Sequence, residues 1–353
     1  MQIFAAAYTQ LDTVQRWDSW TAQRDAWLAE QTSPHTRRAY TAAWDAFFSW
    51  CRLAPWEVTT DHARAWRDHL LADGKAPTTV GHRLTVLSSF YAWAIESRRM
   101  VDGREVSFFQ DAVGVTRSNP FHISRPPIKR WEKANPLTPE LVNRLLARIN
   151  TRHLTGARNY ALLLTYLFTG YRNSEVRSMT WGNLQPHPST PDAWLYRWAG
   201  KGGKSKTDPF PAHAVAAIRH YLDLDGRLTA MQPADHIWQP LPAPGLANLR
   251  NVDPSRLDPA RCISASQVVA ILRACLRAAG LTPAQAAAYT IHDLRHTFCV
   301  EHYREFKDLV ALRDLSHHSS LTSLSIYVIH STDQPLDTHS PRLMARFGVP
   351  PRA

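Results

Sequence analysis

Several features that would identify a protein class at once are missing from this chain of 353 residues. It has no apolar run close to the roughly 18 residues that a membrane helix needs. Its four cysteines show no CxxC spacing, which argues against a disulfide framework or a zinc site and favours a reducing cytoplasm. No basic stretch precedes the short apolar start, which argues against a secretory signal. We therefore expect a globular, cytoplasmic protein long enough for two domains.

The positive charge of the chain is unevenly distributed. Residues 1–118 carry 13 Lys and Arg against 13 Asp and Glu, whereas residues 119–353 carry 28 against 17 and account for the net charge of +11. A basic half favours a polyanionic partner such as nucleic acid, because Lys and Arg neutralise phosphates and release counterions. A merely basic, soluble surface is the alternative, and charge alone leaves it open.

The first third of the chain shows helical periodicity. Apolar residues, many of them aromatic, recur at helical spacing, and turn or capping residues separate the segments. Helices are predicted over 13–31, from about 36 to 51, over 60–71 and from about 78 to 94. The aromatic side chains fit the core of a small helical bundle better than a platform for stacked bases. We expect a helical extension over 1–30 and the bundle over 31–118.

Prolines and basic residues follow the bundle. Residues 119–136 are predicted to form a Pro-rich basic linker, because proline excludes the helix before it. The basic residues in and before the linker are candidates for DNA contact: Arg117, Arg125, Lys129, Arg130 and Lys133. The remainder, 137–353, is expected to form a second domain with a C-terminal tail. It is mostly helical, and residues 193–211 give the only β-hairpin predicted in the chain. The whole chain is therefore predicted to be mainly α with a small β-sheet.

Residues suited to attack on a phosphodiester lie in the second domain. Tyr327 is the last tyrosine, and His318 precedes it by nine residues. A phenol has a pKa near 10 and needs neighbouring cations and a proton acceptor to act as a nucleophile. The segment His292-Asp293-Leu294-Arg295-His296-Thr297 supplies a His and an Arg that share a helix face. Gly170-Tyr171-Arg172-Asn173-Ser174-Glu175 places another arginine directly after a predicted helix and a glycine turn.

A glycine-rich turn with three lysines completes the set. It reads Gly200-Lys201-Gly202-Gly203-Lys204-Ser205-Lys206 and lies between two strand-like segments. A phosphate-binding P-loop is excluded, because that motif needs GxxxxGK[ST] between a strand and a helix.

Taken in chain order, these four segments resemble motifs of the tyrosine recombinase (phage integrase) family. Residues 170–175 resemble its first box, 200–206 its β-hairpin lysine motif, 292–297 its second box and 315–327 its third box. The pattern Thr36, Tyr40, Phe47 and Trp50 is similar to the core-binding domain of that family. The resemblance spans roughly residues 30–335. It implies an N-terminal SAM-like helical core-binding bundle and a C-terminal mixed α/β catalytic domain.

The resemblance also implies roles for single residues. The catalytic residues would be Arg172, Lys201, His292, Arg295, His318 and the nucleophile Tyr327. Glu175 and His296 would support them. Two arginines would stabilise the transition state, so no metal and no cofactor is expected. The implied reaction is site-specific cleavage and rejoining of duplex DNA through a 3′-phosphotyrosine. The implied partner is double-stranded DNA carrying recombination sites, bound by a homotetramer that assembles on it, with no membrane.

Some alternatives stay open. The family usually has glycine where this chain has His317, so the turn is expected to be altered, and His317 is a second candidate for the role of His318. Lys204 or Lys206 could replace Lys201. A type IB topoisomerase would share this chemistry, and a relative that binds DNA but has lost the chemistry would share the fold.

Overall fold

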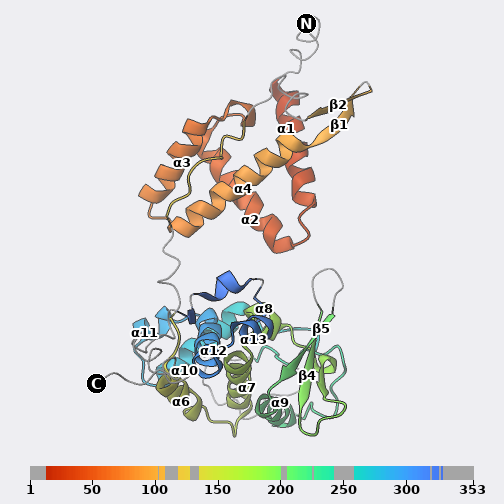
Figure 1. The fold of residues 1–353 in the computed structure, drawn as a ribbon, viewed down its shortest axis with the longest axis vertical. Coiled ribbons are helices and arrows are strands. Elements are labelled where there is room, and N and C mark those ends of the chain that lie inside the picture. Colours follow the sequence, from red (N-terminus) through yellow and green to blue (C-terminus); the bar gives the residue numbers. More distant parts are fainter. Residues whose placement is uncertain are drawn as a thin grey trace, which may run out of the picture. The chain divides into compact units, whose positions relative to one another are not determined.

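The structure is a computed structural model in which the chain divides into two compact units, Met1–Lys129 and Arg130–Ala353 (Figure 1). The residues that it describes are 13–101, 103–107, 118–127, 135–199, 205–224, 226–241, 258–318, 320–325 and 327–328. Most of them are helical and two small antiparallel sheets accompany the helices, which confirms the predicted fold class. Within these ranges no helix is long and apolar enough to cross a membrane.

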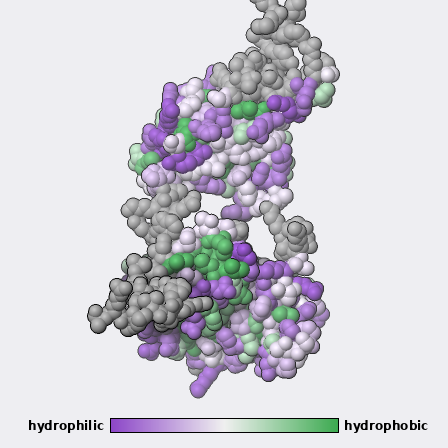
Figure 2. Space-filling view, in the orientation of Figure 1, coloured by the Kyte–Doolittle hydropathy of each residue, from purple (hydrophilic) through white to green (hydrophobic). Residues whose placement is uncertain are grey.

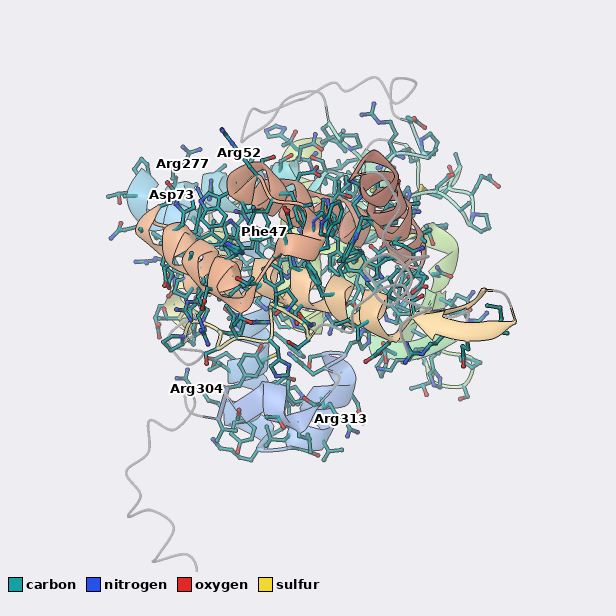
Figure 3. The ribbon with its side chains drawn as sticks, turned by 90° about the horizontal axis from the view of Figure 1, so that it is seen from above. Phe47, Arg52, Asp73, Arg277, Arg304 and Arg313 are labelled. Atoms are coloured by element: carbon teal, nitrogen blue, oxygen red, sulfur yellow. The ribbon has the colours of Figure 1, made fainter. Side chains whose placement is uncertain are left out.

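The N-terminal unit is a helical bundle followed by a short hairpin. Its elements are α1 (Thr13–Ala29), α2 (Pro34–Cys51), α3 (Thr60–Ala72), α4 (Pro77–Glu96), β1 (Arg98–Val101) and β2 (Arg104–Ser107). Ser33 caps α2 and Pro34 occupies its first turn, where the missing amide hydrogen does no harm. Phe47 is fully buried and points inward, whereas Arg52 and Asp73 lie at helix ends (Figure 3). The helices therefore bury their aromatic side chains, as predicted, and the surface of this unit in Figure 2 is mostly hydrophilic.

Two features of this unit differ from the sequence prediction. The hairpin β1–β2 was not expected, because its strands carry charged residues and lack an alternating apolar face. The prediction that 193–211 forms the only hairpin is therefore wrong. Residues 118–127 pack on the bundle, and Phe121 is fully buried with its ring centroid 5.0 Å from that of Phe47. The first half of the expected linker thus contributes to a core.

The C-terminal unit combines helices with a three-stranded sheet. Its helices are α6 (Pro139–Ala147), α7 (Leu154–Thr169), α8 (Asn173–Arg177), α9 (Ala212–Leu224), α10 (Ala265–Ala278), α11 (Pro283–Ala288), α12 (Ile291–Phe306) and α13 (Leu309–Leu315), followed by the 3₁₀ turn η6 (Leu321–Leu324). The antiparallel sheet has the order β3 (Leu184–Pro186), β4 (Trp194–Ala199) and β5 (Ser205–Phe210). The predicted hairpin is β4–β5, and β3 adds a strand too short to be recognised in the sequence.

Helix α7 forms the centre of this unit. It is apolar on nearly all sides and buried on nearly all sides, as expected for a helix covered by others all round. Helices α9 and α12 pack against it. Its C-terminal end and the N-terminal end of α12 carry the residues described next.

Candidate active site

The site begins where α7 ends at Gly170. This residue has φ +63°, and a Cβ atom there would lie 2.2 Å from Cδ1 of Phe298. Glycine is therefore required both by the left-handed backbone and by the close approach of the ring. The carbonyl oxygen of Gly170 accepts a hydrogen bond of 2.8 Å from Nη1 of Arg295. The turn thus connects α7 directly to a functional side chain of α12.

Arg172 lies at the N-terminal end of α8 and is held from two directions. Its Nη1 donates to Oε1 of Glu175 over 2.9 Å, and its backbone N–H donates to Oε2 of the same carboxylate over 2.7 Å. Its Nη2 donates to the carbonyl oxygen of His317 over 2.6 Å. The side chain of Arg172 is still 44% exposed. The guanidinium is therefore fixed in direction and remains accessible to a ligand.

Helix α12 presents Arg295 and two histidines. Asp293 caps this helix, since its Oδ2 accepts from the backbone N–H of Thr290 over 2.7 Å. The other oxygen, Oδ1, accepts from the N–H of Asn135 over 3.2 Å and ties the start of the unit to the helix. Arg295 is 2% exposed, and its Nη2 lies 3.0 Å from Nε2 of His318. Within the described residues its buried Nε has no hydrogen-bond partner.

His318 is held between Arg295 and a serine. The Oγ of Ser316 lies 2.6 Å from Nδ1 of His318 and also donates to the carbonyl oxygen of Leu312. Burial, and then the positive charges of Arg295 and Arg172, lower the pKa of His318 to about 3. The imidazole is therefore neutral at physiological pH.

Tyr327 is buried beside these groups, with 2% of its surface exposed. Its hydroxyl lies 3.0 Å from Nδ1 of His296, and its ring centroid is 5.8 Å from that of His318. Burial raises the pKa of the phenol, and the charge of Arg295 partly opposes this shift. The phenol's neighbour on α12 is thus His296 and not His292, whose ring centroid lies 4.5 Å from that of His296. Burial, and then the charge of Arg295, lower the pKa of His292.

His317 and His318 point in different directions. His317 has φ +57°, the left-handed conformation expected from a position where the family has glycine. Its Nε2 lies 2.5 Å from Oδ2 of Asp208 on β5. His318 alone of the two is next to Arg295 and Tyr327.

Further residues were predicted for catalysis or for DNA contact. Six of them lie outside the described residues, namely Lys201, Lys204, Arg117, Lys129, Arg130 and Lys133. Arg125 donates through Nη1 to the carbonyl oxygens of Phe121 (3.0 Å) and Ile123 (2.7 Å). Its Nε donates to Oγ1 of Thr85 on α4 over 3.3 Å, so it holds its own segment on the bundle.

Sequence reasoning missed Asp208 and Ser316. Both contact a histidine of the third box, and Asp208 does so from a position 109 residues away in the chain. Lys206 was considered only as an alternative lysine, and its Nζ is engaged by Oδ1 of Asp208 (2.8 Å) and the carbonyl oxygen of Asp314 (2.7 Å). The signal available in the sequence was His317 itself, because a histidine where the family has glycine adds a side chain that can pair with a carboxylate.

Comparison with known proteins gives a consistent result. The sequence model of the phage integrase family matches residues 135–334, and that of the phage integrase N-terminal SAM-like domain matches residues 23–98. The second match begins inside the segment that was expected to be an extension.

Individual relatives extend over most of the chain. Tyrosine recombinase XerC of Chlamydia caviae is 25% identical over 281 residues, covering 80% of this chain and 77% of the relative. XerC of Thermodesulfovibrio yellowstonii is 26% identical over 303 residues, covering 85% and 87%. The solved structure of the Tn1549 transposon integrase in complex with transposon right end DNA has a TM-score of 0.60 at 16% identity, covering 94% of this chain and 99% of that one. The chain belongs to the phage integrase family of tyrosine recombinases, enzymes that transfer DNA strands.

Proposed function

We propose that this chain is a site-specific DNA recombinase that cleaves and rejoins duplex DNA through a covalent 3′-phosphotyrosine on Tyr327. The observation that carries the proposal is one cluster of side chains: the Tyr327 hydroxyl lies 3.0 Å from His296, and the charge of Arg295 acts on both Tyr327 and His318. A phenol beside a buried arginine and a neutral histidine is suited to attack on a phosphate.

The two arginines would bind the non-bridging oxygens of the scissile phosphate. Arg172 is partly exposed and held in direction by Glu175. Arg295 is buried and its Nε has no partner within the described part of the chain, which is a costly state for a donor. A phosphate oxygen would satisfy it. Since Arg295 and Tyr327 are each 2% exposed, DNA binding has to open the site before either can act.

The histidines would divide the remaining tasks. His318 is neutral and carries one N–H, which it would donate to the phosphate once DNA binding changes its contacts with Ser316 and Arg295. His296 faces the phenol and packs against His292, so this pair offers a route for the phenolic proton. Tyr327 Oη would form the bond to phosphorus as the bond to the 5′ oxygen breaks. Lys201 would then protonate the departing 5′ oxygen, and the reverse reaction would rejoin the strands.

Duplex DNA is the proposed partner. The basic charge of the second half of the chain favours a polyanion. The similar Tn1549 integrase was solved in complex with transposon right end DNA. Recombination joins two duplexes and requires four strand cleavages, so we propose a homotetramer assembled on DNA.

The test is to trap the adduct in cells that express the protein. DNA that stays attached to the protein in SDS would be sequenced to find the site, and a nicked suicide substrate would be built from that site. Wild type should form the adduct in the presence of EDTA, and Tyr327→Phe should not. Relaxation of a supercoiled plasmid that lacks the site would instead indicate a type IB topoisomerase. Binding without any adduct would indicate a relative that has lost the chemistry.

A further inference from the structure

The turn before His318 contains an ion pair that connects three separate elements. Nε2 of His317 lies 2.5 Å from Oδ2 of Asp208 on β5, and its Nδ1 lies 3.7 Å from Oε1 of Glu175 on α8. One imidazole thus reaches carboxylates that are 33 residues apart in the sequence. The carbonyl oxygen of the same residue accepts the hydrogen bond from Nη2 of Arg172.

The surroundings of His317 hold its ring in place. The ring stacks on Tyr171 with centroids 5.0 Å apart, and it is nearly perpendicular to the ring of Trp198 from β4, with centroids 5.6 Å apart. Asp208 is buried, with 4% of its surface exposed. A buried carboxylate needs a charged or hydrogen-bonding partner, and His317 supplies one that the family's glycine could not.

Other charged groups face this pair. Lys206 on β5 contacts the second oxygen of Asp208 over 2.8 Å, and its positive charge opposes protonation of His317. Glu175 is shared between His317 and Arg172. The carboxylate of Asp314 on α13 is paired with Arg313 and turned to that residue. The two carboxylates of Asp208 and Glu175 therefore face Lys206 and Arg172 as well as His317. Of these groups, His317 alone has an ordinary pKa close to neutral pH.

The protonation of His317 follows from these contacts. Burial favours the neutral ring, but the hydrogen bond to Asp208 and the ion pair with Glu175 outweigh it and raise the pKa of His317. Burial would also raise the pKa of Asp208, but the hydrogen bonds from His317 and Lys206 outweigh it and lower that pKa. A raised histidine pKa stabilises the fold below the ordinary value of 6.5, and this contribution is lost as the pH rises through the raised pKa.

We propose that His317 is a positioning residue for strand cleavage, which acts by linking Asp208 of β5 to Glu175 of α8 and so fixing Arg172. Strand β5 begins at Ser205, four residues after Lys201 in the sequence. The link therefore joins α8, whose Glu175 holds Arg172, to β5, which follows Lys201 in the sequence. This role rests on the proposed function, since its main readout is the rate of cleavage.

The contrary view is that His317 only fills the turn. If so, His317→Gly should match or exceed wild type, because glycine adopts φ +57° without strain. Lys307→Gly is the matched control, since Lys307 has φ +54° in the same unit and is given no role in the proposed cleavage reaction. His317→Asn tests charge separately, because asparagine tolerates this backbone and cannot become a cation.

The first measurement needs no DNA. The pKa of His317 is obtained from NMR titration of its ring proton in wild type, Asp208→Asn and Glu175→Gln. We expect a value above 6.5 in wild type and a lower value in both variants. Equal values in all three proteins would overturn the proposal.

The second measurement is the single-turnover rate of adduct formation over a range of pH, in a double-mutant cycle of His317→Asn and Asp208→Asn. Each change should slow cleavage about tenfold, and the double variant should be no slower than either, since paired residues are not additive. The advantage of wild type over His317→Asn should fall as the pH rises through the raised pKa. Independent, multiplicative effects, or a fully active His317→Gly, would overturn this role alone. A wild type that forms no adduct would overturn the proposed function as well.

Discussion

Arg295 combines two properties that surface arginines do not share. It is 2% exposed, and both of its terminal nitrogens are occupied, one by the carbonyl oxygen of Gly170 and the other by His318. A single guanidinium therefore connects the end of α7, the helix α12 and the third box. The planar fork of arginine can make these contacts together, whereas the ammonium of lysine is a single point.

Replacing the guanidinium of Arg295 by an ammonium should slow cleavage, although the positive charge is kept. For Arg295→Lys we expect single-turnover cleavage to fall by about 10²–10³-fold, the usual effect of removing one preorganised donor. Arg277→Lys is the control, because Arg277 is an exposed arginine on α10 in the same unit (Figure 3). Equal rates for the two variants would contradict the role assigned to Arg295.

Glu175 gives a pH dependence of stability with a defined sign. Burial would raise the pKa of its carboxyl, but the ion pair with His317 and the hydrogen bonds from Arg172 outweigh this effect and lower the pKa to about 2 from the ordinary 4.5. A depressed carboxyl pKa stabilises the folded state above the unfolded value, and the contribution is lost as the pH falls from about 4.5 towards 2.

Glu175→Gln removes this contribution. In urea unfolding, the difference from wild type should be largest between about pH 4.5 and 6.5 and should shrink as the pH drops below 4.5. It should also shrink as the pH rises through the raised pKa of His317, because Glu175 helps to raise that pKa. Glu301→Gln is a suitable comparison, since Glu301 forms a half-exposed ion pair with Arg304. A Glu175→Gln difference that does not vary with pH would show that the carboxylate contributes nothing through its charge.

At the scale of elements, the segment after the hairpin provides a direct test of the fold. Phe121 is fully buried against Phe47 and Trp66, although its segment looked like a linker in the sequence. Phe121→Ala should lower the free energy of unfolding of the N-terminal unit by about 3–5 kcal/mol, because it leaves a cavity in the core. Met100→Ala, at a residue 68% exposed, should change it little. A small effect of Phe121→Ala would mean that residues 118–127 do not pack on the bundle.

The elements that periodicity predicts well are those with one apolar face. Helices α2, α3 and α4 lie close to the predicted ranges, since capping residues such as Ser33 and turns such as Asp73-Gly74 mark their ends. Hairpin β1–β2 and helix α11 were missed, because the first lacks an apolar face and the second has six residues. Short elements owe their structure to their neighbours, which the sequence does not display.

The candidate site shows the same limit. The order of the four boxes indicated which residues carry the chemistry, and the positive φ of His317 follows from its place where the family has glycine. The contact between His317 and Asp208 spans 109 residues and could not be derived from spacing. Nor could spacing show that His296, rather than His292, faces the phenol.

At the scale of the whole molecule, charge distinguishes the two units. Residues 1–129 carry 15 Lys and Arg against 13 Asp and Glu, whereas residues 130–353 carry 26 against 17. On the proposed function, the C-terminal unit should dominate the electrostatic part of DNA binding.

Each phosphate contact contributes about −0.9 to the slope of log affinity against log salt. Titrations of the full chain and of each unit with duplex DNA should give a steep slope for residues 130–353 and a shallow one for residues 1–129. The reverse order would contradict this assignment.

The central claim is that Tyr327 becomes covalently attached to DNA, and peptide mass spectrometry of the trapped adduct tests it most directly. Digestion of the adduct from the suicide substrate should yield one peptide that carries a nucleotide through a phosphodiester on Tyr327. Tyr303→Phe, at the preceding tyrosine, should leave the yield unchanged, and Tyr327→Phe should abolish it. A nucleotide on another residue, or an adduct that persists in Tyr327→Phe, would contradict the account.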